Sequence, residues 1–205
     1  MRILKVNQKN LKEVTEKVQQ LVKEGKVIIC PTDTVYGLVC DATNIKAVRR
    51  FLKIKRRPKN KPIPIFVKNL KMAKKLAKID KKQEKILKAV WPGKATTVLK
   101  RTCFRKGFGG RGKIRLYGVD KKTIALRLPD YKLLNVLLKK LNCPLAETSA
   151  NISGRPTLTK IKEIIKQFKS QKYQPDLAID AGNLLKSRPS VVLDLTSWPP
   201  KILRI

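Results

Sequence analysis

The chain has 205 residues, of which 49 are Lys or Arg and 14 are Asp or Glu, so its formal charge at neutral pH is +35. It contains no histidine, which excludes Ser-His-Asp and Cys-His nucleophiles and every histidine-containing metal site. A surface of this charge concentrates polyanions such as RNA, nucleotides or acidic membranes. A solvated, uniformly lysine-rich surface would give the same composition without a nucleic-acid partner.

Length and hydropathy indicate one globular domain over residues 1–205, because 42% of the residues are apolar. No apolar run reaches the about 18 residues of a membrane helix, and Met1–Leu11 does not resemble a signal peptide. We therefore expect a cytoplasmic protein without a membrane partner. The cysteines are scattered without a C-x-x-C pair, which favours buried reduced thiols over a zinc site or disulfides; they are Cys30, Cys40, Cys103 and Cys143.

Hydrophobic periodicity predicts helices and strands in a mixed order. Helices are expected at Asn10–Lys23, Ile45–Lys55, Leu70–Ile79, Lys81–Val90, Leu133–Leu141 and over a stretch carrying Ile161, Ile164, Ile165 and Phe168. Strands are expected at Val27–Cys30, Ile63–Val67, Thr96–Arg101, Thr123–Leu128, Pro144–Ala146, Leu177–Ile179, Val191–Leu195 and Ile202–Ile205.

Four residues refine this prediction. Thr159 is placed to cap the helix that follows it, and Pro64 favours an edge or irregular position for its strand. In the strand after Thr123, alternation places Thr123 and Arg127 on the face opposite the core. Several strand pairs lack a crossover helix, so we predict an α/β (α+β) fold with a twisted mixed sheet, flanking helices and a basic concave face.

Three polar clusters stand where predicted elements end. Residues 31–38 (PTDTVYGL) follow a buried strand and could present oxygen atoms to a small polar substrate. Residues 55–62 gather five cations within seven residues and suit a triphosphate, because guanidinium binds phosphate bidentately and ammonium acts as a point charge. Residues 149–157 offer hydroxyls and an amide to phosphate oxygens. Each cluster alone could equally be an ordinary polar turn.

The insert Thr102–Lys122 is basic and glycine-rich. Gly107, Gly109 and Gly112 have the spacing of a dinucleotide-binding fingerprint. No helical pattern follows them and no acidic residue lies about 20 residues further on, so we reject that interpretation. We interpret the insert as a mobile basic loop that could contact RNA.

Together, the clusters resemble the short form of the YrdC/TsaC-type L-threonylcarbamoyladenylate synthases, and the resemblance extends from Val27 to Ile205. The family's P-T-x-T-x-Y-G-L stretch matches residues 31–38. Its K-x-R pair matches Lys55 and Arg57, and its S-x-N pair matches Ser149 and Asn151. Residues 91–93 (WPG), 125–129 (ALRLP) and 202–204 (ILR) follow in the family's order.

The resemblance implies a single YrdC-like domain that joins L-threonine, bicarbonate and ATP into threonylcarbamoyl-adenylate and pyrophosphate, for tRNA modification. It assigns the catalytic role to Lys55 and Arg57. It assigns ATP binding to Lys55, Arg57, Lys61, Thr123, Asn151, Thr159 and Arg204, and threonine binding to Thr34, Arg127, Ser149 and Ser190. No residue is assigned to a metal; Mg²⁺ is expected to arrive with the nucleotide. Asp33 is the nearest carboxylate for organising a metal or an amine.

Two positions depart from the family pattern. Phe66 stands where some relatives have a histidine that approaches threonine, and Val191 replaces the threonine of a Ser-Thr-Val triplet that begins at Ser190. The effect of both on the pockets is open, as is direct contact with tRNA or double-stranded RNA. Separate proteins would transfer the threonylcarbamoyl group to tRNA.

Two other functions stay open on this sequence. One is a non-catalytic RNA-binding or ribosome-associated module on the same fold, which the net charge favours. The other is a paralogue with the same fold and different chemistry. The presence of both the K-x-R and the S-x-N pair favours the enzyme. The enzyme hypothesis requires the two clusters that contain these pairs to converge on one cavity.

Overall fold

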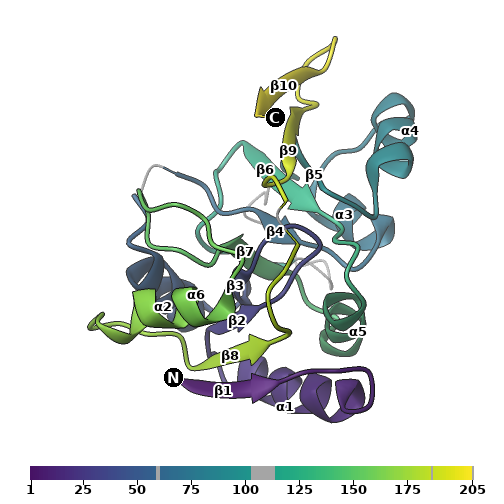
Figure 1. Ribbon diagram of the computed structural model, residues 1–205. Helices are drawn as coiled ribbons and strands as arrows, with labels where there is room; N and C mark the ends of the chain where they lie inside the picture. The colour runs from purple at the N-terminus through teal and green to yellow at the C-terminus, as the bar shows by residue number, and fades with distance from the viewer. Residues whose placement is uncertain (59–60, 103–113, 186, 205) are drawn as a thin grey trace.

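The computed structural model describes residues 1–58, 61–102, 114–185 and 187–204 (Figure 1). Gly107, Gly109 and Gly112 of the predicted insert lie outside these residues. The strands are β1 (Arg2–Lys5), β2 (Ile28–Cys30), β3 (Gly37–Asp41), β4 (Ile65–Phe66), β5 (Ala95–Lys100), β6 (Thr123–Arg127), β7 (Leu145–Ser149), β8 (Leu177–Asp180), β9 (Val191–Asp194) and β10 (Lys201–Arg204). The helices are α1 (Leu11–Lys23), α2 (Ile45–Lys55), α3 (Leu70–Leu76), α4 (Lys81–Val90), α5 (Lys132–Leu141) and α6 (Ile161–Lys169).

The described strands form one mixed sheet in the order β1-β8-β2-β3-β7-β4-β6-β5-β9-β10. β8 pairs in parallel with β1 and β2, whereas β3 pairs antiparallel with β2 and β7. β1 and β10 lie at opposite ends of the molecule (Figure 1). The mixed α/β sheet predicted from the sequence is therefore confirmed.

Register sorts the strand side chains onto two faces. Ile65, Leu126 and Ala146 are cross-strand partners, and they belong to the core that α2 and α6 cover. Phe66 and Leu145 point to the other face, where α1 and α5 cover the sheet. This cover reaches Phe66 on β4 and Leu145 on β7, whereas residues of β5, β6 and β9 and the end of β7 line a cavity.

The local sequence explains where α2 begins and ends. The Asn44 side chain accepts hydrogen bonds from the backbone N–H groups of Lys46 and Ala47 and so caps the helix. The helix stops because Arg56 adopts a left-handed conformation, with φ 52°. This termination places Lys55 at the very end of a rigid helix, facing inward.

Most predicted elements agree with the structure to within a few residues, with four corrections. β1 and β3 were not predicted, because β1 carries charged residues and β3 begins inside the cluster at residues 31–38. Of the edge or irregular position expected from Pro64, the edge is wrong, since β4 lies between β6 and β7; the regular strand is limited to Ile65–Phe66, and Pro64 precedes it. Lys160, not Thr159, is the N-cap of α6, without a side-chain cap. β7 runs on to Ser149, three residues beyond Ala146.

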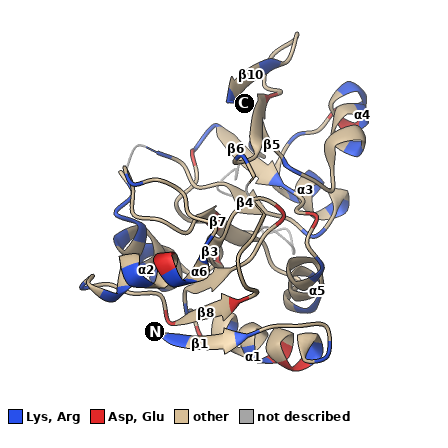
Figure 2. Cartoon of the chain, viewed as in Figure 1, with Lys and Arg blue, Asp and Glu red and all other residues tan. Residues whose placement is uncertain are grey.

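Charge is spread over the whole molecule. Lys and Arg occur along all the labelled helices, and Asp and Glu occupy far fewer places (Figure 2). None of the described helices combines the length and apolar character that a membrane crossing requires.

Gly118 and Gly182 form a matched pair for testing backbone packing. Both have positive φ, 70° and 77°, but a Cβ on Gly118 would lie 2.3 Å from the Cδ1 of buried Ile63, whereas one on Gly182 meets nothing within 4 Å. Gly182→Ala should lower the free energy of unfolding by about 1 kcal/mol, the cost of the left-handed backbone. Gly118→Ala should lower it by about 2–4 kcal/mol, because overpacking adds to that cost. Urea denaturation measures both, and equal losses would contradict the packing seen at Gly118.

Candidate active site

One cavity of about 630 Å³ receives side chains from all three polar clusters. Every residue predicted for the site lines it except Thr159, whose carbonyl accepts a hydrogen bond from the Leu184 N–H instead. Thr157 lines the cavity in its place. A second, larger cavity lies elsewhere on the molecule, and its lining includes no residue of the three clusters.

Lys55 connects the basic cluster with the Ser149–Thr157 loop. Its side chain is 4% exposed, and its Nζ donates to the carbonyl of Ser149 at 2.7 Å, to the Ser149 Oγ at 3.2 Å and to the Asn151 Oδ1. Burial, together with the nearby Arg57 charge, lowers the pKa of Lys55 to about 7, although Glu147 opposes the shift. Protonation of this amine near neutral pH therefore depends on whether an anion is bound in the cavity.

Arg57 is held in place by backbone carbonyls. Its Nε donates to the carbonyl of Lys61 at 2.9 Å, and its Nη2 donates to that of Pro62. Its Nη1 lies 3.4 Å from the Oγ1 of Thr148, on the cavity side. These two carbonyls fix the orientation of the Arg57 guanidinium, so its remaining N–H groups can donate to an incoming oxyanion in a constant direction.

The loop after β7 is joined to the other two clusters. Asn151 donates from Nδ2 to the carbonyl of Arg155, and its Oδ1 accepts from the Ser149 Oγ at 2.7 Å. The backbone N–H of Ala150 donates to the carbonyl of Tyr36 at 2.7 Å, and that of Ser153 donates to the carbonyl of Lys55 at 2.9 Å. The predicted convergence of these loops is present.

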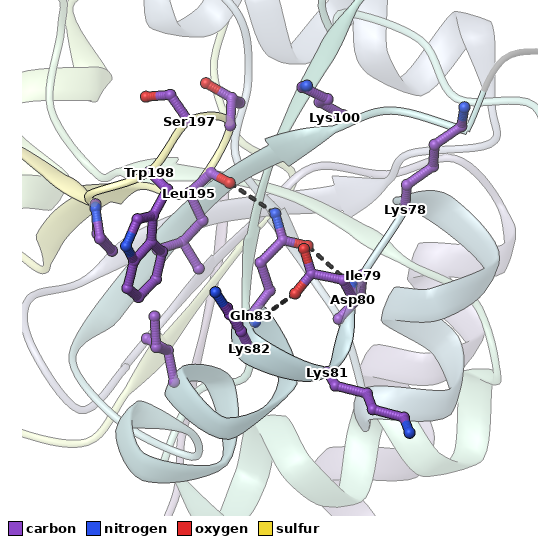
Figure 3. A pocket seen from close by; sticks show the side chains of 13 residues that line it. Lys78, Ile79, Asp80, Lys81, Lys82, Gln83, Lys100, Leu195, Ser197 and Trp198 are labelled. Atoms are coloured by element: carbon purple, nitrogen blue, oxygen red, sulfur yellow. Dashed lines mark hydrogen bonds between the residues drawn. The ribbon is translucent and has the colours of Figure 1, made fainter.

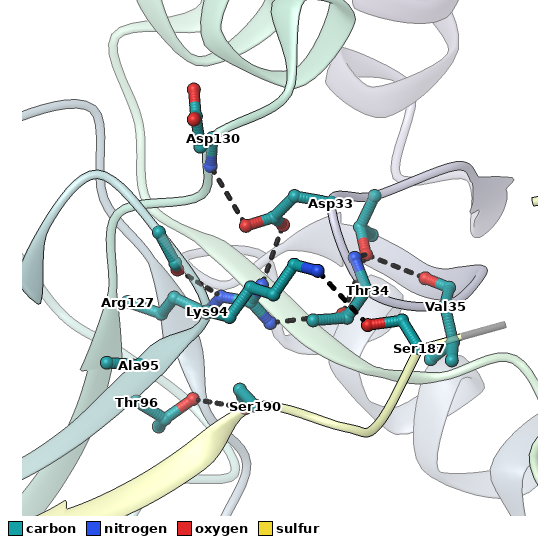
Figure 4. Close-up of polar contacts among 12 residues, drawn as sticks. Asp33, Thr34, Val35, Lys94, Ala95, Thr96, Arg127, Asp130, Ser187 and Ser190 are labelled. Carbon is teal, nitrogen blue, oxygen red and sulfur yellow. Dashed lines mark hydrogen bonds and ion pairs between the residues drawn. The ribbon is translucent and has the colours of Figure 1, made fainter. Parts of the chain in front are cut away.

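Arg127 also lines the cavity, and Figure 4 shows its polar contacts. This side chain is only 2% exposed, and its Nη2 pairs with the Asp33 Oδ1 at 2.6 Å. Its Nε donates to the carbonyl of Gly93 at 3.1 Å, and its Nη1 lies 3.4 Å from the Thr34 Oγ1. The guanidinium carbon lies 5.7 Å from the centroid of the Phe66 ring, so Phe66 supports Arg127 through a cation–π contact.

Asp33 does not have the role expected from its position. Its carboxylate binds Arg127 and also accepts the backbone N–H of Asp130 at 3.2 Å, and the residue does not line the cavity. The idea that Asp33 organises a metal or an amine is therefore wrong in this arrangement; it fixes Arg127 instead. Within the described residues, no group of three or more Cys, Asp or Glu side chains is placed to hold a metal ion.

Two terminal strands complete the cavity. The Ser190 Oγ lies 2.9 Å from the Oγ1 of Thr96 on β5. Arg204 on β10 donates from Nη2 to the Ser190 carbonyl at 2.7 Å and to its Oγ at 3.2 Å. On the adjoining wall, the Thr123 hydroxyl donates to the Asp120 carboxylate at 3.2 Å. The hydroxyls of Ser190 and Thr123 are thus oriented by neighbours within the site.

Glu147 is the site residue that sequence reasoning missed. It lines the cavity two positions before Ser149 on β7, and its Oε1 lies 3.4 Å from the point where a Cβ on Gly37 would stand. Its carboxylate makes no side-chain hydrogen bond or ion pair with the described part of the chain. Burial raises its pKa, although four cations favour its charged form; these are Arg127, Lys55, Arg204 and Arg57. Strand alternation from Ser149 could have identified it.

A cavity that joins a cationic turn, a loop of hydroxyls and an amide, and a buried arginine suits a phosphorylated ligand beside a small carboxylate ligand. The chain belongs to the Sua5/YciO/YrdC family, whose model, described as telomere recombination, matches residues 20–205.

Two relatives bear related names. The chain is 34% identical over 184 residues to the threonylcarbamoyl-AMP synthase of Pyrococcus abyssi, a match that covers 89% of this chain and 51% of that protein. It is also 34% identical over 196 residues to a putative threonylcarbamoyl-AMP synthase of Methanocaldococcus jannaschii, covering 95% and 86%. The chain thus spans about half the length of the P. abyssi protein.

Solved structures agree with the fold. The crystal structure of P. abyssi Sua5 complexed with L-threonine has a TM-score of 0.82 at 30% identity, over 99% of this chain and 56% of that one. Escherichia coli YciO has a TM-score of 0.81 at 26% identity, over 99% and 93%. The same fold therefore occurs in a protein crystallised with threonine and in one that bears no activity in its name.

The lowered pKa of Lys55 predicts a pH dependence of stability. Folding lowers this pKa from 10.5 to about 7, so between these values the unfolded chain holds more protons than the folded one. The free energy of unfolding should then rise with pH through this window, and Lys55→Met should remove that contribution. Chemical denaturation from pH 7 to 8.5 measures the slope. Lys46→Met, on the exposed side of α2, is the matched control and should keep the wild-type slope; an unchanged slope in Lys55→Met would contradict the shift.

Proposed function

We propose that this protein is an enzyme that forms L-threonylcarbamoyladenylate and pyrophosphate from L-threonine, bicarbonate and ATP, for the threonylcarbamoyl-adenosine modification of tRNA. The observation that carries the proposal is the buried Lys55 ammonium, which joins the K-x-R turn to the S-x-N loop inside a single cavity. The names of the relatives and the threonine complex of P. abyssi Sua5 support it. A cytoplasmic location and separate transfer proteins are part of the same proposal.

ATP would occupy the cationic side of the cavity. Arg57 offers the fixed fork, Lys61 and Arg204 add charge, and hydroxyl and amide groups of Thr123 and Asn151 complete the set. We assign the catalytic role to Lys55 and Arg57, which neutralise charge on the phosphates during attack on the α-phosphorus. Mg²⁺ would enter as part of the nucleotide substrate. Holding the reactants in line can supply about 7–11 kcal/mol of the barrier.

L-Threonine would lie against the wall formed by Arg127 and Thr34. Asp33 binds one side of the Arg127 guanidinium and keeps it in place, while Nη1 faces Thr34 and the cavity. That nitrogen suits the substrate carboxylate. Ser190 would contact threonine from the β9 side, and Ser149 would stand between threonine and the nucleotide.

Glu147 would accept the proton that the threonine ammonium must lose. Without histidine, it is the cavity carboxylate that is free of internal partners among the described residues. The carboxylate takes one proton from the ammonium, and the freed amine attacks the carbon of bicarbonate. Threonine carbamate forms and water leaves. A carbamate oxygen then attacks the α-phosphorus of ATP, and pyrophosphate departs.

The alternative, a non-catalytic RNA-binding or ribosome-associated module, rests on the charge of +35. Pyrophosphate release separates the two. The enzyme should release pyrophosphate from ATP only when both threonine and bicarbonate are present. A purified, folded protein that releases none under these conditions would refute the proposed reaction. Salt-sensitive RNA binding does not discriminate, since the charge alone predicts it.

Arg57→Ala should reduce threonine-dependent pyrophosphate release by about 10²–10³-fold, because the variant loses a fixed donor to the developing phosphate charge. Arg56→Ala is the matched control; Arg56 is exposed, points to Gln171 on the other side of the turn, and should retain near-normal turnover. Thermal unfolding should be alike in both variants. Equal activities for the two variants would contradict the catalytic role assigned to Arg57.

Glu147→Gln should lower kcat by about 10²–10⁴-fold while the KM for ATP stays the same or falls, since the variant loses a base and a negative charge. Wild-type activity should rise with pH through the raised pKa of Glu147, because the base acts deprotonated, and the variant should lack this rise. Glu147→Asp keeps a carboxylate and should keep the pH dependence. A wild-type pH profile in Glu147→Gln would assign the proton transfer to another group.

A further inference from the structure

A second cavity of about 960 Å³ lies where the start of α4 meets the turn between β9 and β10 (Figure 3). We refer to it as the Trp198 groove. The β9–β10 hairpin borders both cavities: Ser190 and Arg204 line the active site, and Leu195, Trp198 and Pro200 line the groove. None of the residues that line the groove belongs to the proposed reaction.

The groove is strongly cationic. Four lysines line it, and none of them pairs with a carboxylate of the described chain; they are Lys78, Lys81, Lys82 and Lys100. The one acidic residue of the lining is Asp80, and its carboxylate caps the N-terminus of α4. Its carboxylate accepts the Gln83 N–H at 2.8 Å, and the Gln83 side chain accepts the Asp80 N–H at 2.9 Å. The electrostatic field in the groove is therefore available to an external anion.

An aromatic ring stands among these lysines. Trp198 is 64% exposed, whereas the other tryptophan, Trp91, is buried and donates its indole N–H to the Ala95 carbonyl at 2.9 Å. The Lys82 Nζ lies 5.5 Å from the centroid of the Trp198 ring. Ile79 and Ile86 add apolar surface. An exposed indole beside an ammonium offers a ligand both a π-face and a charge.

The groove is built on fixed backbone. The Gln83 side chain donates to the Leu195 carbonyl at 2.7 Å and so ties α4 to the end of β9. The Lys78 N–H donates to the Lys100 carbonyl at 2.9 Å. The Asp194 carboxylate accepts the N–H of Thr196 at 2.8 Å and begins the turn that carries Trp198. A preformed site loses less conformational entropy on binding.

We propose that the Trp198 groove binds single-stranded RNA, with an unpaired base stacked on the exposed face of Trp198 and flanking phosphates on the four lysines. The combination of a free aromatic face and unpaired cations within one groove selects this ligand. In a duplex the base faces are stacked on each other, and an acidic peptide supplies charge without a stacking partner. The inference does not depend on the proposed reaction.

Fluorescence anisotropy of a labelled, uridine-rich RNA of about 12 nucleotides tests the groove at fixed salt. Trp198→Ala should weaken binding by about 5- to 150-fold, the effect of losing one stacked base. Trp198→Phe should recover part of the affinity. Binding of a duplex RNA of equal length should change less than twofold (about 0.4 kcal/mol at RT ≈ 0.59 kcal/mol). Replacing Lys81 or Lys100 by Gln should each lower the salt slope by about 1.

Tyr173→Ala is the matched control. Tyr173 is also an exposed aromatic beside two lysines, Lys53 and Lys172, but it lies outside the groove. It should leave RNA affinity unchanged, and all variants should keep the wild-type melting temperature and pyrophosphate release. Wild-type RNA affinity in Trp198→Ala, or an equal loss in Tyr173→Ala, would overturn the proposal. The proposal would also be overturned if Trp198→Ala weakened the binding of a polyglutamate peptide but not the binding of RNA. That outcome would indicate a protein partner.

Discussion

A lysine ammonium placed almost out of solvent holds the candidate site together. An isolated charge in such a position is costly unless hydrogen-bond acceptors surround it, and here Ser149 and Asn151 supply them. The helix that delivers the lysine ends at that residue, and the acceptors lie at the end of a central strand and in the loop that follows it. The cavity therefore derives its geometry from regular structure, and the turns between add the remaining donors.

Sequence reasoning identified much of this arrangement because its signals are local. Periodicity located α2 to the residue, and alternation along β6 put Thr123 and Arg127 on the face that forms the cavity wall. The resemblance to a known family supplied the correspondence between distant clusters. No local pattern could have shown that two loops about 90 residues apart in sequence share one lysine, because that contact depends on strand order in the sheet.

The misses have physical reasons. Nothing in the sequence indicated that Asp33 has a partner, and only the fold shows that its carboxylate forms an ion pair with the buried guanidinium of Arg127. Glu147 sits in a strand with ordinary composition, and its importance comes from the four cations contributed by other elements. Thr159 lies in a loop whose path the sequence does not determine, so its side chain could not be assigned to the cavity or excluded from it.

The position of β10 at the margin of the sheet has a dynamic consequence. Among the described strands it pairs only with β9, and all four of its residues are exposed, yet it carries Arg204 into the cavity. A strand with one neighbour and little buried surface detaches at a lower free energy than the core does. Detachment would withdraw one cation while the rest of the wall stays assembled. A bound polyanion that contacts Arg204 would favour the attached state of β10, so β10 would become more ordered as more of the cavity is occupied by ligand.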